Sequence, residues 1–343
     1  MMRLPLSWLL AFTTAALALL LLGSLATGPM TLTLGESLRA LFAGQESGIE
    51  SHKLLIVQEI RLPRTLLCIA VGGILGLCGA VMQGLFRNPL ADPGIIGVSG
   101  GAALGAALAI VLLAPLGQQL QATIGVGLLP LLAFLGGALT TTLVYLLGTR
   151  EGGTSVTVML LAGVAITALS GAVIGLLTYL ADDQMLRNLS LWQMGTLAAG
   201  KPADVALALL TLAAQLWLFM RDANPLNALL LGEGEARHLG VNVQSLKRRL
   251  ILLTAAGVGV AVAVSGMIGF VGLVVPHLVR LLAGPNHVRL LPLSALLGAA
   301  LLLAADMLAR TLLAPAELPV GIITALLGAP FFIWLLVKGR RAL

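Results

Sequence analysis

The stretch EIRLPRTLL, residues 59–67, leads into a run without any charged residue that extends over residues 65–86. A helix needs about 20 mainly apolar residues to cross a bilayer, so this run predicts a membrane span. Arg61 and Arg64 stand one helical turn apart at the mouth of the span and share one face of the helix. The stretch therefore predicts a membrane protein in which one span opens with two paired cations.

The composition of the whole chain supports a membrane protein. Of the 343 residues, 59% are hydrophobic and only 10% are charged, which is too little polar surface to cover a water-soluble globule of this size. The 20 Lys and Arg residues outnumber the 14 Asp and Glu residues, but they lie in short connectors between apolar runs. That distribution is typical of membrane topology and argues against a nucleic-acid partner.

Charge-free runs predict ten membrane-spanning helices in one transmembrane domain, residues 1–343. The run 93–149 must fold back on itself, and Pro115, Gly117 and the polar residues 118–121 mark the turn. The run 250–279 contains Gly266, Gly269 and Gly272, so we divide it into a full helix and a shorter one. The runs are 4–35, 65–86, 93–149, 152–181, 205–220, 250–279, 290–305 and 318–337.

The basic residues also predict the orientation. With the N-terminus inside, most of the 20 Lys and Arg residues fall in cytoplasmic connectors, as the positive-inside rule requires, and both termini are cytoplasmic. The first run is longer than an ordinary signal-peptide core and ends without a clear cleavage site, so we expect an uncleaved span. Arg61, Arg64 and Arg310 are left on the outer side, where topology does not explain them.

The spans are poor in groups that could do chemistry. Gly72, Gly76, Ala80 and Gly84 follow one another every four residues, which favours close helix packing. No acidic or basic residue falls near the middle of a predicted span, whereas ion-coupled transporters generally need one. Because neither a catalytic constellation nor a metal cluster is visible, we expect no enzyme activity, no metal and no permanently bound cofactor.

Three connectors are longer or more unusual than a turn requires. Residues 86–105 combine an Asn-Pro pair with a glycine-rich helix start. Residues 224–250 carry an amphipathic pattern that predicts two short cytoplasmic helices broken by Gly240, with an apolar face for a soluble partner. Residues 306–336 place Arg310, Glu317 and Pro319 ahead of the last span.

Five stretches, in this order and spacing, resemble the permease family of bacterial ABC importers for iron-siderophores, heme and cobalamin. They are RLPR (61–64), GAVMQGLFRNPLADPGIIGVSGGA (79–102), LGEGEARHLGVNV (231–243), GFVGLVVPH (269–277) and AELPVGIITALLGAPFFIWLL (316–336). The resemblance implies a homodimer in the bacterial inner membrane, with two ATP-binding subunits below it and one periplasmic substrate-binding protein above. ATP is then used by the partner, because this chain has no G-x-x-x-x-G-K-[ST] loop.

The resemblance also assigns roles to residues. It places a coupling segment, which seats in the ATPase, within residues 224–249, and an inner gate at the cytoplasmic end of a path flanked by the fifth helix of each subunit. Exposed cations at the outer mouth would attract an acidic binding protein and orient it. The docking residues are Arg61, Arg64 and Arg310; the coupling residues are Gly232, Glu233, Glu235, Ala236, Arg237, Leu239 and Gly240; and the gate residues are Asn88, Leu90, Val156 and Thr157.

Cargo is the least determined property. The motif RNPLADPG resembles heme permeases more than siderophore members. Heme is therefore the first cargo that we expect, with a siderophore or cobalamin as the alternatives. Two other classes remain open from the residues alone. An ion-coupled secondary transporter would take up cargo without a partner ATPase, and a membrane scaffold would show no cargo-stimulated ATP hydrolysis.

Overall fold

The computed structural model describes residues 5–42, 50–113, 127–150, 153–198 and 200–340. Within these ranges, seven segments are long and apolar enough to cross a membrane, and three shorter apolar helices accompany them. They correspond one by one to the ten predicted spans and confirm an all-α membrane protein. The turn predicted at Pro115, Gly117 and residues 118–121 lies outside the described residues.

The long spans begin with α1 (Leu6–Ala26). The second is a continuous segment, Ser51–Leu85, made of α3 (Ser51–Leu55), the π-helical turn η1 (Ile56–Arg61) and α4 (Leu62–Leu85). The others are α7 (Leu128–Gly148), α8 (Val156–Leu180), α10 (Pro202–Arg221), α13 (Val243–Ser265) and α15 (His287–Thr311). The shorter ones are α5 (Val98–Val111), α14 (Val271–Ala283) and α16 (Val320–Arg340).

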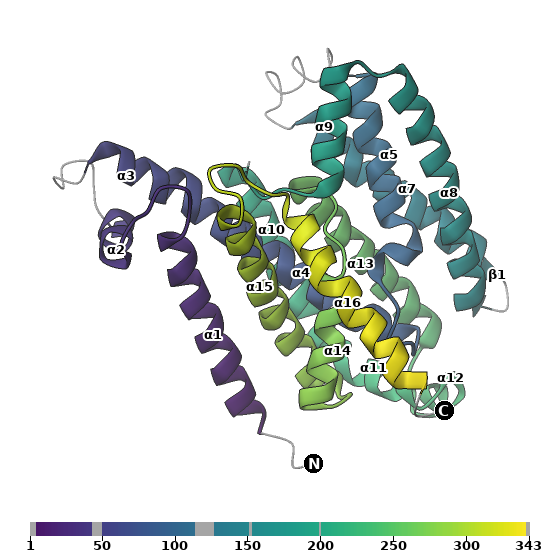
Figure 1. Ribbon diagram of the computed structural model, residues 1–343. Helices are drawn as coiled ribbons and strands as arrows, with labels where there is room; N and C mark the ends of the chain where they lie inside the picture. Colours follow the sequence, from purple (N-terminus) through teal and green to yellow (C-terminus); the bar gives the residue numbers. More distant parts are fainter. Residues whose placement is uncertain (1–4, 43–49, 114–126, 151–152, 199, 341–343) are drawn as a thin grey trace.

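Helix α4 is the centre of the subunit. In its most apolar stretch 89% of the residues are buried, against 17% in α1 and in α8. The helix packs against α10, α13, α14 and α15. Figure 1 shows α1 at one flank and α8 at the opposite flank, with α4 between them. The exposed leucines of α1 and α8 therefore lie on outer faces, where lipid or another membrane helix can cover them.

Glycines allow α4 to approach its neighbours closely. A Cβ on Gly72 would lie 2.4 Å from the carbonyl oxygen of Gly298, and one on Gly76 would lie 2.3 Å from that of Ser294, both in α15. A Cβ on Gly79 would lie 1.9 Å from the carbonyl oxygen of Gly272 in α14. The predicted small-residue face is thus confirmed at Gly72 and Gly76, where backbone meets backbone. Gly84 lies against the ring of His287 instead, and Gly79, which was outside the predicted face, makes the third close approach.

Shorter elements connect the spans. At the end of the molecule where α4 begins lies α2 (Leu34–Phe42), and at the other end lie α11 (Ala223–Leu230) and α12 (Glu233–His238). The 3-10 turn η2 (Pro93–Ile96) precedes α5, α9 (Asp183–Met194) follows α8, and β1 (Thr149–Arg150) pairs antiparallel with β2 (Gly153–Thr154) just before α8. The chain breaks between α13 and α14 at Gly266, as the glycines predicted.

Three details differ from the predictions. Helix α15 continues past residue 305 to Thr311, because Asp306 and Arg310 pair within it at 3.0 Å and neutralise each other. The two short helices of the connector 224–250 are broken at Gly232, while Gly240 ends the second of them. Helix α9 was not predicted, since its mixed polarity resembles an outer connector.

The close packing of α4 against α15 predicts a clear effect of one added methyl group. Gly76→Ala should lower the free energy of unfolding by about 1–3 kcal/mol, since the rigid backbone of α15 must move to accept the new atom. Thermal unfolding of the purified permease in detergent measures this. Gly35→Ala in α2, where nothing lies within 4 Å of the added Cβ, is the matched control, and equal melting of both variants would contradict the packing account.

Candidate functional site

The predicted docking arginines gather at one end of the molecule, in a cluster that contains two acids. We call Arg61, Arg64, Arg310, Asp306 and Glu317 the arginine cluster. Arg64 donates from Nε to Asp306 at 3.0 Å and from Nη1 to Glu317 at 2.7 Å. Arg310 forms the second ion pair of Asp306. A single buried carboxylate therefore serves two guanidinium groups that come from α4 and α15.

The other donors of the cluster cap α1. Arg61 donates from Nη1 to the carbonyl oxygens of Leu25 at 2.7 Å and Ala26 at 2.8 Å. Arg310 donates from Nη2 to the hydroxyl of Ser24 at 2.8 Å. The last carbonyls of a helix have no partner within the helix and carry partial negative charge, so cations there are favourable. The cluster thus fixes the end of α1 to α4 and α15.

The expectation that these arginines are exposed is wrong for the isolated subunit. Arg61, Arg64 and Arg310 are 3%, 4% and 2% exposed, because each guanidinium turns inward to an acid or a helix end. Glu317 is the accessible member of the cluster, with its side chain 35% exposed. The sequence pattern located the cations correctly at the mouth of the span but missed Asp306 and Glu317 as their partners.

A second polar contact lies beside the arginine cluster. Lys53 of α3 donates to Glu36 of α2 at 2.9 Å. This hydrogen bond, together with those from the backbone and side chain of Thr33, lowers the pKa of Glu36 to about 2. Glu36 is therefore a carboxylate at neutral pH, and the surface at this end of the molecule carries fixed charges of both signs.

The coupling residues predicted from the sequence lie together at the opposite end. They occupy α12 and the two glycines that bound it, Gly232 with φ +124° and Gly240 with φ +82°. Ala236 is fully buried inside the subunit, whereas Leu239 is 63% exposed. Leu239, with the exposed charges Glu235 and Arg237, is thus available to a partner, and Ala236 is not.

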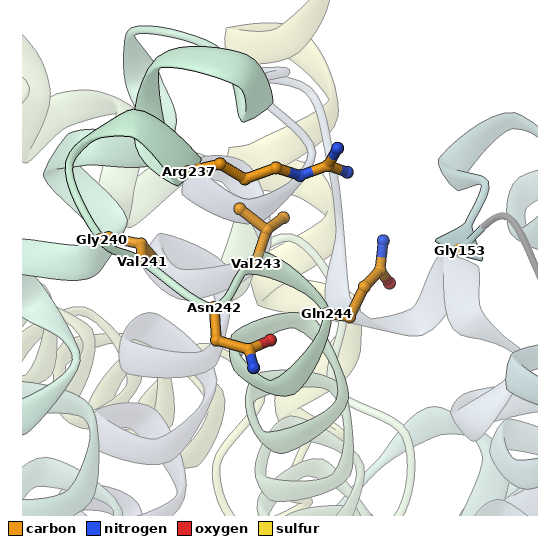
Figure 2. Close-up of a pocket in the computed structure, with 7 residues that line it drawn as sticks. All are labelled: Gly153, Arg237, Gly240, Val241, Asn242, Val243 and Gln244. Carbon is orange, nitrogen blue, oxygen red and sulfur yellow. The ribbon is translucent and has the colours of Figure 1, made fainter.

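A shallow pocket lies between this segment and the β1–β2 hairpin. Its volume is about 420 Å³, and Figure 2 shows the side chains that line it on the α12–α13 side, facing Gly153 of the hairpin. The lining residues are Gly153, Arg237, Gly240, Val241, Asn242, Val243 and Gln244. Residues of the predicted coupling segment therefore lie across this pocket from the hairpin that precedes α8.

The predicted gate residues occupy two separate turns. Asn88 accepts the backbone N–H of Leu90 at 2.9 Å, which closes the turn after α4. Val156 and Thr157 form the first turn of α8, capped by Ser155. Within the described ranges, no hydrogen bond joins the two pairs, although η2 packs on α8 where Gly163 meets the carbonyl of Ile95. The turn of Asn88 is thus followed by η2, which packs on α8, but the two turns do not meet within the described residues of one subunit.

Comparison with known proteins agrees with this arrangement. The pattern described as the FecCD transport family matches residues 16–338. The hemin transport system permease protein HmuU of Yersinia pestis is 47% identical over 97% of this chain and 96% of its own length. The cobalamin import system permease protein BtuC of Halobacterium salinarum is 44% identical over 87% of this chain and 77% of its own.

A solved structure shares the fold. An inward-facing metal-chelate type ABC transporter superposes with a TM-score of 0.81 at 34% identity, over 96% of this chain and 98% of that one. The order of helices and their packing around α4 are therefore not peculiar to this chain.

The arginine cluster predicts unequal roles for its two acids. Asp306→Asn should lower the free energy of unfolding by about 3–5 kcal/mol, because it leaves the buried Arg310 without a counter-charge and Arg64 with only the partly exposed Glu317. Glu317→Gln should cost less than about 1 kcal/mol, since water screens this partly exposed pair. Thermal unfolding in detergent compares them, and an Asp306→Asn variant as stable as the wild type would show that the buried pairs are not needed.

Proposed function

This chain belongs to the FecCD transport family and is the membrane-spanning permease of a bacterial ATP-driven importer, and from that premise we propose that its cargo is heme. The ATPase is a separate subunit in this family. The observation that carries the heme proposal is the 47% identity to a hemin permease over nearly the full length of both chains. The cobalamin permease of Halobacterium salinarum is less similar and matches less of the chain.

Uptake by the reconstituted importer tests the cargo. We expect proteoliposomes that contain the permease and its ATPase subunit, supplied with the cognate binding protein, to accumulate hemin only when ATP is present. Cobalamin and a ferric siderophore, each offered alone, should not enter above the level of vesicles without permease. Uptake of either one in place of hemin would overturn the heme proposal, and uptake driven by an ion gradient without ATP would overturn the importer mechanism.

The assembly that we propose is a homodimer with two ATPase subunits and one binding protein. Helix α8 supports it, because its exposed side includes Leu161 and Leu169, and because a Cβ on Gly171 or Gly175 would meet nothing within 4 Å. Small residues on an open helix face let the backbone of another helix approach. In this proposal α8 flanks the path along the dimer axis, and the turns of Asn88 and Val156 close its inner end.

The orientation follows from the same proposal. The end that carries α12 faces the cytoplasm together with both termini, and the arginine cluster faces the periplasm. Leu239 enters the ATPase, with Glu235 and Arg237 around it, and this contact makes residues 232–240 the coupling segment. The basic connectors at this end of the spans support the orientation through the positive-inside rule.

Docking of the binding protein needs a different mechanism from simple exposed cations. Arg64 already holds Glu317, so a carboxylate of the binding protein reaches its outer Nη1 only by displacing that side chain. Because Glu317 is 35% exposed, such an exchange costs little. Arg61 and Arg310 then act by holding the end of α1 in place, and Arg310 also pairs with Asp306, the acid that orients Arg64.

This mechanism predicts that removing Glu317 helps docking. Glu317→Gln should raise the association rate with the binding protein several-fold at low salt, because the internal competitor for Arg64 and a repulsive charge are both lost. Glu36→Gln is the matched control, since it removes the same charge at the same end of the molecule without touching Arg64. Surface plasmon resonance on nanodisc-embedded permease measures both rates. Equal rates for the two variants would limit the arginine cluster to a structural role.

A further inference from the structure

A buried lysine joins the coupling segment to the start of α8. The side chain of Lys247, in the second turn of α13, is only 2% exposed. Its Nζ donates to Glu233 Oε1 at 2.6 Å and to the backbone carbonyl oxygen of Thr154 at 3.0 Å. Glu233 is the first residue of α12, and Thr154 ends the β1–β2 hairpin two residues before α8 begins. One ammonium group thus bridges two segments that are far apart in the chain.

Gln244, one helical turn earlier on α13, holds the same hairpin. The backbone N–H of Thr154 donates to Gln244 Oε1 at 3.1 Å. Gly153 has φ +116°, a conformation that favours glycine, and a Cβ there would lie 2.3 Å from Gln244 Nε2, so the amide packs directly on this glycine. Figure 2 shows Gln244 on α13 and Gly153 across the pocket from it. Both backbone polar groups of Thr154, its N–H and its C=O, are therefore bound by side chains of α13.

The link to α12 has no equivalent substitute. Arg237, the other cation near Glu233, lies 3.9 Å away and its side chain is 60% exposed, so it forms a weak surface pair. The Lys247 contact is shorter, and its cation is buried although Glu233 is partly exposed. Separation of a buried lysine from its counter-charge is costly, because no water replaces the lost partner. Displacement of α12 therefore pulls on Lys247, and through it on the hairpin.

We propose that Lys247 is the positioning residue that transmits movement of the coupling segment to the first turn of α8, at Val156 and Thr157. The inference rests on the proposed function, in that it takes α12 as the contact for the ATPase and the first turn of α8 as part of the inner gate. When the ATPase shifts α12, Glu233 carries the lysine ammonium with it, and the carbonyl of Thr154 follows. The gate turn of α8 then changes position because Thr154, two residues before it, is fixed to the same cation.

A purely structural role would make Lys247 a staple between two surface segments. Its loss would then lower stability and expression, while the importer that still assembled would couple ATP use to transport as before. A transmitting role predicts a different result, because coupling means that a change at one site alters the free energy of the other. Binding at α12 must change the behaviour of the hairpin, and that change must depend on the lysine.

Amide hydrogen exchange of the permease in nanodiscs, measured with and without the ATPase subunit, tests this directly. Adding the ATPase subunit should protect the peptide that covers α12 and, in the wild type, should also change exchange in the peptide that covers residues 153–159 several-fold. In Lys247→Met, which keeps the length of the side chain without its charge, α12 should still be protected while residues 153–159 no longer respond. Arg248→Met is the matched control, since this neighbouring cation is exposed and should respond as the wild type does.

A functional ratio provides the second measurement. The amount of hemin transported per ATP hydrolysed should fall about two- to thirtyfold in Lys247→Met, the range by which single residues alter coupling between sites. Glu233→Gln, which removes the same ion pair from the other side and leaves the lysine in place, should lower the ratio in the same direction. Both ratios are read on transporter that has assembled, so a loss of expression does not affect them.

The outcomes separate this inference from the proposed function. If α12 is protected and residues 153–159 respond equally in Lys247→Met and in the wild type, the lysine does not transmit and the inference fails, while the function stands. If wild-type residues 153–159 do not respond although α12 is protected, the two segments are not linked and the inference also fails. If the ATPase does not protect α12 at all, the coupling assignment is wrong and the inference is overturned with it. A wild type that couples ATP to another cargo overturns heme alone.

Discussion

The close approach of α4 to α15 and α14 is the constraint on which the rest of the subunit depends. Lipid offers no hydrophobic force between helices, so helices in a membrane associate through tight packing and polar contacts. Gly72, Gly76 and Gly79 supply the tight packing by letting backbone carbonyls of the neighbours lie where side chains would otherwise be. With α4 held in this way, the ends of α4, α14 and α15 have fixed positions relative to one another.

The charged side chains that a membrane protein can bury are placed at the ends of this packed centre. At one end, Asp306 neutralises Arg64 and Arg310, and the remaining donors of the arginines satisfy the last carbonyls of α1. At the other end, Glu233 and the carbonyl of Thr154 share Lys247. Arg64, Arg310 and Lys247 are each paired with an acid, and Arg61 is hydrogen-bonded to carbonyl oxygens, as a site of low dielectric constant requires. Both ends therefore combine stability with a contact that a partner protein can disturb.

These two ends differ in how a partner would reach the buried charge. Glu317 is partly open to solvent, and in the proposed docking mechanism a carboxylate of the binding protein exchanges with it on Arg64. Lys247 is inaccessible, and only displacement of α12 reaches it. Binding at the outer end would thus replace Glu317 on Arg64 with another carboxylate. Binding at the inner end would move α12 together with Glu233. In both proposals the effect of a partner passes through a few direct contacts, and the packing of α4 against α14 and α15 need not change.

The sequence alone determined the number of spans, the division of α13 from α14 at Gly266, the packing face of α4 and the family, because hydrophobic length, glycine spacing and long motifs are local properties of the chain. It also predicted that the three arginines lie at helix ends, whereas the role of residues 232–240 as a coupling segment stays a prediction. It did not reveal that Arg61, Arg64 and Arg310 turn inward, that α15 carries Asp306 and Arg310 within the helix, or that Lys247 meets Thr154. Those features depend on pairs such as Arg64 with Asp306 and Lys247 with Thr154, which are separated by 242 and 93 residues along the chain. Only the tertiary structure decides them, since a charged side chain takes the partner that folding brings within reach, and no local pattern encodes which partner that is.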